Sequence, residues 1–298
     1  MIGIKEFNKK INSLKNTQKM TKTMKMVSAS KFKRAHKAQV SAKDYAYKLT
    51  EFMKQLSTSL PTNHPLLKTR KVVTKALVVL FTSDKGLCGG FNNNLIRKTH
   101  HWINNNRYRF TTLDMSFCGR RGYMSFRRTA KIKEYYENIT MKPNFEDSLV
   151  LANDITDSFI KAEYEEIYLA YNRFDGPMSQ TPVIEKILPL DPSAFNTAEI
   201  APEVTPKKKL PRSEDYSYEP EEKQIFSFLI PKFLNFKIFY TLLENAAGEH
   251  GARMSAMDKA SSNTADLIER YTMLRNRARQ ASITTELIEI ISGAEALK

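Results

Sequence analysis

The sequence predicts an α/β protein whose N- and C-terminal helices form a long antiparallel coiled coil. Three observations support this prediction. Residues 4–60 contain neither glycine nor proline, and after Pro231 only three glycines interrupt a run of good helix formers. Between these segments, short apolar runs alternate with helical patterns, which is typical of an α/β domain. Two long helices at opposite ends of one chain can bury their apolar seams most simply by packing against each other.

The C-terminal helix is expected to carry a weak seam followed by a strongly apolar end. Its seam residues recur at alternating three- and four-residue steps with one position skipped, and they are Met254, Met257, Ser261, Thr264, Ile268, Tyr271, Ala278 and Ser282. Small and polar residues bury little area, so this part of the coil should be held loosely.

The last turns of this helix are apolar on nearly every side. The residues responsible are Ile283, Leu287, Ile288, Ile290, Ile291, Ala294, Ala296 and Leu297. A helix that is apolar all round is buried all round. We therefore expect partner chains to enclose this end, and the alternative is that it is a core helix of the chain's own domain.

The N-terminal helix has a three- and four-residue pattern of its own. Ile4, Phe7, Ile11 and Leu14 begin it, Met24 and Val27 continue it after a shift in phase, and Ala35, Ala38, Ala42, Tyr45, Leu49, Phe52 and Leu56 resume it. Residues 1–60 also carry fourteen Lys or Arg against three acidic residues, which is most of the formal net charge of +15. A basic face of this kind, with Lys22, Lys25, Lys31, Lys33 and Arg34, is typical of a solvated helix, of nucleic-acid binding or of contact with acidic protein.

The central segment is expected to form a Rossmann-like α/β domain with a mostly parallel sheet. Strands are predicted at residues 75–81, 109–117, 132–136, 166–174 and 181–188, and helices at 91–102, 120–128 and 145–162. Strands that alternate with helices favour a parallel sheet covered on both faces. The expected domains are an N-terminal coiled-coil helix at 1–60, the α/β domain at 72–190, a surface loop at 191–224 and a C-terminal coiled-coil helix at 225–298, with Leu60–Pro65 as a linker.

No group of residues in the sequence is arranged for catalysis. The glycine-rich turn Ser83–Gly90 follows a strand and precedes a helix, where a phosphate loop is expected, but no Gly-Lys-Ser/Thr follows it. We interpret it as a tight turn with Asp84 near the helix start, and nucleotide binding is the alternative. Cys88 and Cys118 are expected in the core, with a redox role as the alternative. The five histidines show no metal-ligand spacing, so we expect no catalytic, cofactor-binding or metal-binding residue.

The composition is that of an ordinary soluble protein, with 41% hydrophobic and 27% charged residues. No run of about 18 apolar residues and no secretory signal is visible. We expect the chain to stay where it is made, in a reducing cytoplasm.

Three stretches closely resemble the gamma subunit of F-type ATP synthases. They are IKEFNKKINSLKNTQKMTKTMKMVSASKFKRA, TSDKGLCGGFNNNLIR and ENAAGEHGARMSAMDKASSNTADLIERYTMLRNRARQASITTELIEIISGAEAL. The resemblance spans the whole chain. It implies that the two terminal helices form the shaft of a rotor, that the α/β domain forms its foot, and that partner subunits enclose the apolar end.

The resemblance also implies partners and a mechanism. The partners would be three alpha and three beta subunits, the epsilon subunit and the membrane ring of c subunits, without nucleic acid and with membrane association only through that ring. Ion flow would turn the ring and the shaft, and the shaft would change the nucleotide sites on the beta subunits during ATP synthesis or hydrolysis. The chain would be a non-catalytic, peripheral protein at the cytoplasmic face of the bacterial inner membrane. The alternative function is a basic coiled-coil protein that binds nucleic acid.

Nine residues match family positions that would contact the beta subunit. Arg279 and Gln280 match the pair that hydrogen-bonds a beta loop, and further residues of this set are Thr284, Glu286, Met24, Lys31, Arg34, Arg253 and Glu249. For each charged position, a solvated helix face is the alternative. The sequence departs from the family at Gly248 and Gly251, where Ser or Ala is more frequent. Each glycine costs up to about 1 kcal/mol of helix stability, which predicts a softer coil there.

Overall fold

The structure, a computed structural model, describes residues 4–56, 64–191 and 222–295 of the chain. The surface loop predicted at 191–224 lies almost entirely outside these residues, and so do residues 60–63 of the predicted linker Leu60–Pro65. The chain divides into two compact units. The sheet unit comprises the described residues from Ser30 to Ala252, and the helix-pair unit comprises those up to Ala29 and from Arg253 onward.

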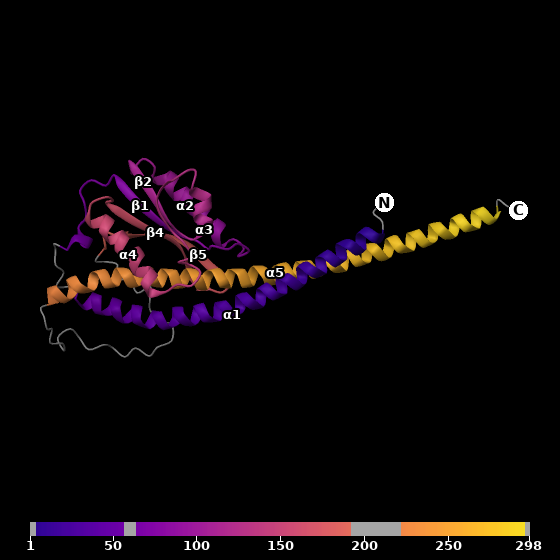
Figure 1. Cartoon of the computed structure of the whole chain (residues 1–298), viewed down its shortest axis with the longest axis horizontal. Helices are drawn as coiled ribbons and strands as arrows, with labels where there is room; N and C mark the ends of the chain where they lie inside the picture. The colour runs from indigo at the N-terminus through magenta and orange to yellow at the C-terminus, as the bar shows by residue number, and fades with distance from the viewer. Residues whose placement is uncertain (1–3, 57–63, 192–221, 296–298) are drawn as a thin grey trace. The chain divides into compact units, whose positions relative to one another are not determined.

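A five-stranded sheet forms the centre of the sheet unit (Figure 1). Its strands are β1 (Lys75–Phe81), β2 (Thr112–Cys118), β3 (Lys131–Tyr136), β4 (Glu166–Gly176) and β5 (Ser179–Leu188). They lie in the order β3-β2-β1-β4-β5, with the first four parallel and β5 antiparallel to β4. The predicted mostly parallel sheet is therefore confirmed. The unbroken apolar run of β1 places it in the middle, because a central parallel strand is buried on both faces.

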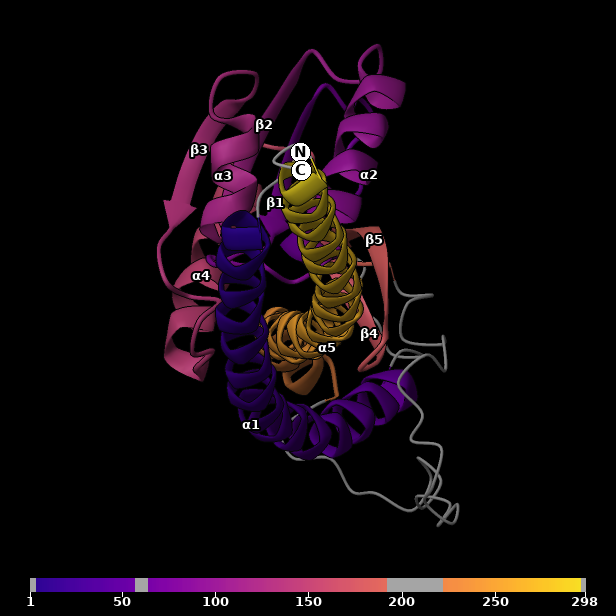
Figure 2. The same cartoon turned by 90° about the vertical axis from the view of Figure 1, so that its right-hand side faces the viewer.

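Helices cover both faces of this sheet (Figures 1 and 2). Helices α2 (Phe91–Asn106) and α3 (Arg120–Phe126) pack on one face, where Leu95 and Phe126 meet the side chains of β1 and β2. On the other face lie η2 (Pro65–Leu67), α4 (Phe145–Ile160) and the first part of α5 (Glu222–Glu295). The result is a core of two layers, one on each side of the sheet.

One stripe of α5 explains how this helix packs against the sheet. Every fourth residue in its first part is fully buried, and these residues are Phe226, Ile230, Leu234, Ile238 and Leu242. The helix continues through Pro231, which lies next to this stripe, so it begins before the proline. By length and composition α5 contains an apolar stretch long enough to cross a membrane. Within the sheet unit, the apolar side chains of this stripe form part of the core.

The two glycines that depart from the family pattern lie where other elements approach α5 closely. A Cβ added at Gly248 would lie 3.0 Å from Cε2 of Phe91, and one added at Gly251 would lie 3.0 Å from the carbonyl oxygen of Pro177. Contacts this short leave little room for a side chain. The glycines therefore allow α2 and the β4–β5 hairpin to pack tightly on the helix.

Helix α1 (Ile4–Leu56) keeps one phase along its length, so the predicted phase shift is wrong. Its buried and half-buried residues follow three- and four-residue steps from Ile4 to Met53. Polar side chains occupy the positions that interrupt the apolar pattern, and the most deeply buried are Thr21, Ser28 and Gln39. Val27 and Tyr45, which were expected in the seam, are more than half exposed.

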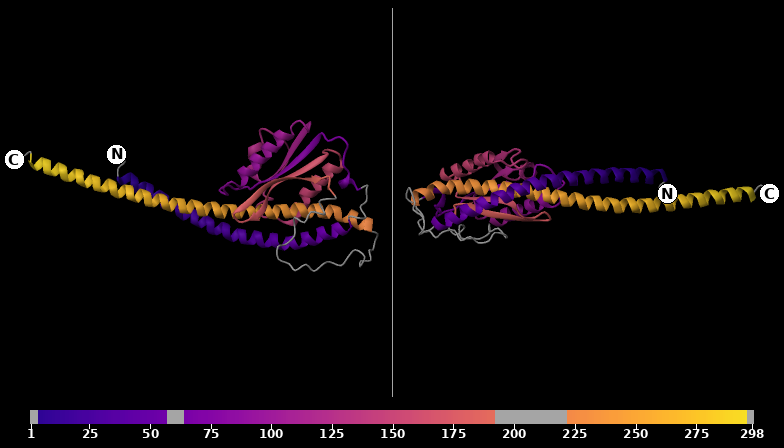
Figure 3. Two further views of the ribbon diagram at one scale, coloured as in Figure 1. Left: turned by 180° about the vertical axis from the view of Figure 1, so that it is seen from behind. Right: turned by 90° about the horizontal axis from the view of Figure 1, so that it is seen from below.

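Within the sheet unit, α1 runs beside α5 (Figure 3). Gln39 donates its amide to the hydroxyl of Tyr240 at 2.8 Å, and the ring centroids of Tyr45 and Phe236 lie 4.7 Å apart. The buried glutamine thus has a hydrogen-bond partner on the neighbouring helix, which removes the cost of placing it in the seam.

Candidate partner interface

The helix-pair unit consists of residues 4–29 of α1 and residues 253–295 of α5. Nζ of Lys25 lies 2.6 Å from Oδ1 of Asp258, and Nη1 of Arg275 donates to Oδ1 of Asn8 at 3.3 Å. These contacts join the late part of one helix to the early part of the other, so the pair is antiparallel, as predicted. The lysine and aspartate side chains are 42% and 60% exposed, so this ion pair contributes little to stability.

Polar residues run through the seam of this helix pair. The buried apolar residues of the seam are Met257 and Ile11. Other positions of the same three- and four-residue repeat are buried but polar, namely Thr264, Thr21 and Ser28. The skipped position of the predicted seam is Arg275, which is half-buried and binds Asn8. The seam is continuous, but it buries little apolar surface.

Beyond Ser282, the described part of α5 is exposed on all sides. Its large apolar side chains are 49% to 67% exposed, and they are Ile283, Leu287, Ile288, Ile290 and Ile291. The alternative of a core helix within the chain is therefore wrong for these residues. A contiguous apolar surface of this kind is typical of a protein–protein contact.

The apolar surface at this end does not continue the seam with α1. At about 100° per residue, Gln280, Ile283, Thr284, Leu287 and Ile291 share one face of the helix. The seam positions 271, 275, 278 and 282 lie on roughly the opposite face. The end of α5 therefore presents a second surface that α1 does not use.

The structure brings four of the predicted contact residues together on this end. Arg279, Gln280, Thr284 and Glu286 are all exposed. The hydroxyl of Thr284 donates to the carbonyl oxygen of Gln280 at 2.9 Å, and the hydroxyl of Ser282 donates to Oε1 of Glu286 at 3.1 Å. No described carboxylate lies within 4.0 Å of the Arg279 guanidinium, so its donors are available to a partner.

The other predicted contact residues lie elsewhere. Met24 is half-buried in the helix-pair unit. Lys31 and Arg34 are exposed and belong to the sheet unit, where Nη2 of Arg34 lies 3.5 Å from Oγ of Ser30. Glu249 and Arg253 are only 5% and 8% exposed. Residues buried to this degree offer little surface to another chain.

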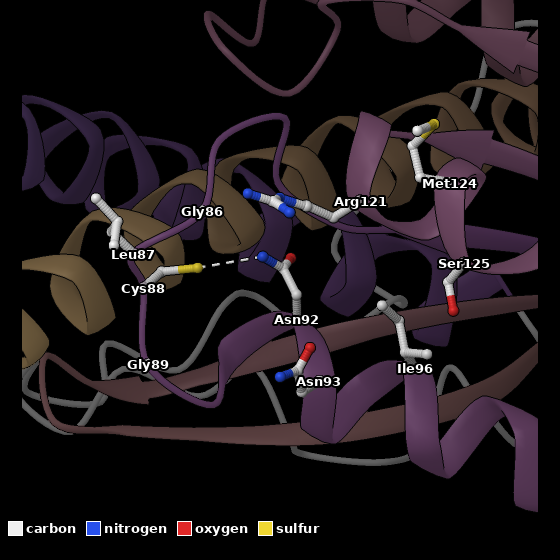
Figure 4. A pocket seen from close by; sticks show the side chains of 10 residues that line it. All are labelled: Gly86, Leu87, Cys88, Gly89, Asn92, Asn93, Ile96, Arg121, Met124 and Ser125. Atoms are coloured by element: carbon white, nitrogen blue, oxygen red, sulfur yellow. Dashed lines mark hydrogen bonds between the residues drawn. The ribbon is translucent and has the colours of Figure 1, made fainter.

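Asn92, in the first turn of α2, closes the glycine-rich turn with hydrogen bonds, and Figure 4 shows the one to Cys88. The side-chain oxygen of Asn92 accepts the backbone N–H of Ser83 at 2.9 Å, and its amide donates to Oγ of Ser83 at 2.7 Å and to Sγ of Cys88 at 3.2 Å. Gly89 has a φ of 59°, which glycine adopts readily. We interpret the turn as a structural connection between β1 and α2.

Asp84 does not lie at the start of α2, in contrast to the sequence prediction. Its Oδ1 accepts the backbone N–H of Arg120 at 2.9 Å, and its Oδ2 accepts the hydroxyl of Thr140 at 2.9 Å. It therefore caps α3, whose own N-cap residue Gly119 has no side chain to do so. Local sequence patterns could not predict this contact, because Asp84 and Arg120 are 36 residues apart in the chain.

Both cysteines are buried, as predicted. Burial raises the pKa of the Cys118 thiol well above its ordinary value, with a smaller contribution from the charge of Asp84. A thiol that stays protonated is a poor nucleophile. Among residues 4–56, 64–191 and 222–295, no group of three or more His, Cys, Asp or Glu side chains could hold a metal ion.

Comparison with known proteins identifies the family. The sequence model of the family described as ATP synthase matches residues 3–297. The ATP synthase gamma chain of Geotalea uraniireducens is 40% identical over 298 residues, and that of Geobacter sp. strain M21 is 38% identical over 298 residues, with all of both chains covered in each case. The chain belongs to the ATP synthase gamma chain family. This confirms the resemblance seen in the sequence.

Solved structures of the family have the same fold. A chain of the Tetrahymena thermophila mitochondrial ATP synthase central stalk and c-ring is 25% identical, with a TM-score of 0.56 over 81% of this chain and 99% of that one. A chain of the Euglena gracilis mitochondrial enzyme reaches a TM-score of 0.61 at 18% identity, over 99% of this chain and 94% of that one. The present chain is thus a central-stalk rotor subunit of a membrane-associated F-type ATP synthase.

Proposed function

We propose that this chain couples rotation of a membrane ring of c subunits to conformational change at nucleotide sites on the beta subunits. In this proposal, the exposed end of α5 turns inside a sleeve of three alpha and three beta subunits, and the sheet unit binds the epsilon subunit and the ring. The chain itself is non-catalytic. It is a peripheral protein at the cytoplasmic face of a bacterial inner membrane.

The exposed end of α5 is the observation that supports this proposal best. Its apolar side chains face away from the seam, and Arg279 and Gln280 stand at the start of this surface. A guanidinium can bind a carboxylate with two parallel hydrogen bonds, which fixes the geometry of a contact as well as its strength. These residues suit a partner that presents both apolar surface and a carboxylate.

Asymmetry of the shaft would supply the coupling. Arg279 and Gln280 occupy one side of α5, so a surrounding beta subunit would meet them at one angle of rotation and not at others. A rotor can shift an equilibrium only through contacts that differ between the two states. We propose the same role for Thr284, Glu286, Met24, Lys31 and Arg34, and we assign Glu249 and Arg253 to the interior of the chain because of their burial.

Reconstitution with alpha and beta subunits tests the proposal. ATP hydrolysis and size-exclusion elution would be measured for the subunits alone, with this chain, and with R279A/Q280A. We expect a stable complex with raised hydrolysis only when the chain is present. We expect R279A/Q280A to lower hydrolysis at least about tenfold, because loss of a buried charge contact costs about 2–5 kcal/mol.

The matched control is N263A/R270A, which removes an amide and a guanidinium from exposed positions earlier in α5. It should keep hydrolysis within about twofold of the wild type, because substitutions at exposed positions usually have small effects. Equal losses in the two variants would contradict the roles given to Arg279 and Gln280. Failure of the wild-type chain to form a complex would contradict the proposed function as a whole.

A further inference from the structure

Helices α2 and α3 pack on the same side of the sheet and carry many exposed basic residues. They lie against each other, since the rings of His100 and Phe126 stack with centroids 4.0 Å apart. Neither helix contains an acidic residue. The exposed basic residues on these helices and at their ends are Arg97, Lys98, Arg107, Arg120, Arg121, Arg127 and Arg128. We call this group the α2–α3 face, and none of its residues belongs to α1.

Among the described residues, the arginines of the α2–α3 face form no ion pair. No described carboxylate lies within 4.0 Å of the guanidinium of Arg107, Arg120, Arg121, Arg127 or Arg128. Asp84 and Glu137 line one hollow with Arg120, and Asp84 accepts the backbone N–H of that residue, so they offset part of its charge. Two further acids bind other groups, since Asp114 binds Lys131 at 3.0 Å and Glu166 binds Arg109 at 2.7 Å. A cluster of arginines without carboxylate partners favours an external anionic ligand.

A hollow of about 410 Å³ lies between the two helices and the glycine-rich turn (Figure 4). Arg121 projects into it from α3, with Nη2 only 2.4 Å from where a Cβ at Gly86 would lie. Asn93 and Ser125 add polar groups to its wall. Two apolar side chains border it as well, since Leu87 is 61% and Met124 is 43% exposed. The hollow therefore combines a cation, neutral polar groups and apolar surface.

We propose that the α2–α3 face binds the anionic phospholipid surface of a membrane. Guanidinium groups bind phosphate oxygens bidentately, and arginines near an anionic bilayer each contribute about 1 kcal/mol of binding. Arg121 in the hollow binds a lipid phosphate, and Leu87 and Met124 contact the apolar part beneath it. The exposed apolar residues beside the arginines favour a lipid over a nucleic acid, whose phosphates have no apolar layer behind them.

This inference concerns a surface that the proposed rotor contacts do not use, and it does not rest on them. It adds a second membrane contact to the one through the ring of c subunits. An electrostatic contact with fluid lipids does not fix the chain at one angle, because individual lipids exchange freely beneath it. The face is therefore compatible with rotation.

Vesicle flotation of the purified full-length chain tests the inference. Vesicles of phosphatidylcholine alone would be compared with vesicles containing about 30 mol% phosphatidylglycerol, in about 0.15 M salt. We expect binding only to the anionic vesicles. R120Q/R127Q/R128Q should weaken it at least about tenfold, and R121Q by about fivefold, given the contribution of each arginine near a charged bilayer.

The matched control is K10Q/K15Q/K22Q, which removes the same charge from exposed positions of α1. It should weaken vesicle binding by less than about threefold, because it lowers the net charge of the chain but leaves the arginines of the α2–α3 face in place. Circular dichroism checks that each variant keeps its helices. Equal losses in the two triple variants would overturn the inference, as would equal binding to neutral vesicles.

Soluble anions separate a lipid surface from other sources of negative charge. Glycerol 1-phosphate, a short DNA duplex and polyglutamate would be added at the same total charge as the exposed phosphatidylglycerol. The inference requires that most of the chain stays on the vesicles. Displacement by the first would indicate a site for a small phosphate, and displacement by the second or third would indicate a nucleic acid or an acidic protein as the partner.

Discussion

Glu244 gives a prediction that follows directly from burial. Its carboxylate lies on α5 and is 7% exposed. Its pKa is raised from 4.5 to about 7, mainly by burial and also by the neighbouring charge of Glu185. Lys237, Arg173 and the backbone N–H of Phe174 act in the opposite direction. Tyr171 and Tyr240 are the other titratable groups that face this cluster.

The direction of the pH dependence follows from this raised pKa. Between about pH 4.5 and pH 7 the folded chain keeps the proton on Glu244, whereas the unfolded chain releases it. The favourable contribution is complete below pH 4.5 and is lost as the pH rises through 7. At about 1.36 kcal/mol per pH unit, the loss amounts to roughly 3 kcal/mol at pH 8.

The variant E244Q removes the charge while keeping the size of the side chain. We expect it to be about 2–3 kcal/mol more stable than the wild type at pH 8 and equally stable at pH 4. Urea unfolding, followed by the fluorescence of Trp102, measures this difference in the sheet unit, because the chain has one tryptophan. E269Q, at an exposed position, is the control and should change nothing at either pH.

Two results would refute this reasoning. One is a stability difference between E244Q and the wild type that is the same at pH 4 and pH 8. The other is lower stability of E244Q at pH 8. The first result would mean that folding does not shift the pKa of Glu244. The second would mean that Glu244 is charged and well paired in the folded chain, so that its pairing outweighs the cost of burial.

Two further predictions concern the turns at the ends of β1 and β2. N92A should destabilise the sheet unit by about 2–3 kcal/mol, because it leaves the backbone N–H of Ser83 without its acceptor. The control N93A, at an exposed position, should change the free energy of unfolding by less than about 0.5 kcal/mol. G119A should cost at least about 2 kcal/mol, because Gly119 has a φ of 106° and an added Cβ would lie 2.2 Å from the carbonyl oxygen of Thr82. G293A, where an added Cβ meets nothing within 4 Å, should instead stabilise the helix by up to about 1 kcal/mol. Urea unfolding measures the stability of N92A, N93A and G119A, and circular dichroism measures the helicity of G293A. Unchanged stability in N92A or G119A would contradict the contacts described for these turns.

The order and type of the elements could be predicted from the sequence because they depend on local patterns. The apolar run at residues 75–81 became β1 without a change of bounds. The absence of glycine and proline from residues 4–60 indicated one long helix, and α1 fills the described part of that range. The all-round apolar end of α5 indicated a surface for other chains, since no local partner could cover it.

The polar seam could not be predicted, because its residues are ordinary surface types. Thr21 and Ser28 are buried only because α5 lies against them. Their polarity interrupts the apolar pattern and so suggests a shift in phase, although the repeat continues through them. The roles of Glu249 and Arg253 had the same limit, since a charged residue in a sequence gives no sign of how deeply it is buried.

By itself, the sequence determined the two long helices, the alternating α/β segment between them and the family, because periodicity, helix breakers and motif residues are local properties of the chain. The tertiary structure alone decided which residues are neighbours. It brought Asp84 to the start of α3, placed the buried Glu244 near Glu185, and brought α2 and α3 with their arginines to the same side of the sheet. Burial and charge depend on what surrounds a side chain, and those surroundings come from segments far apart in the sequence.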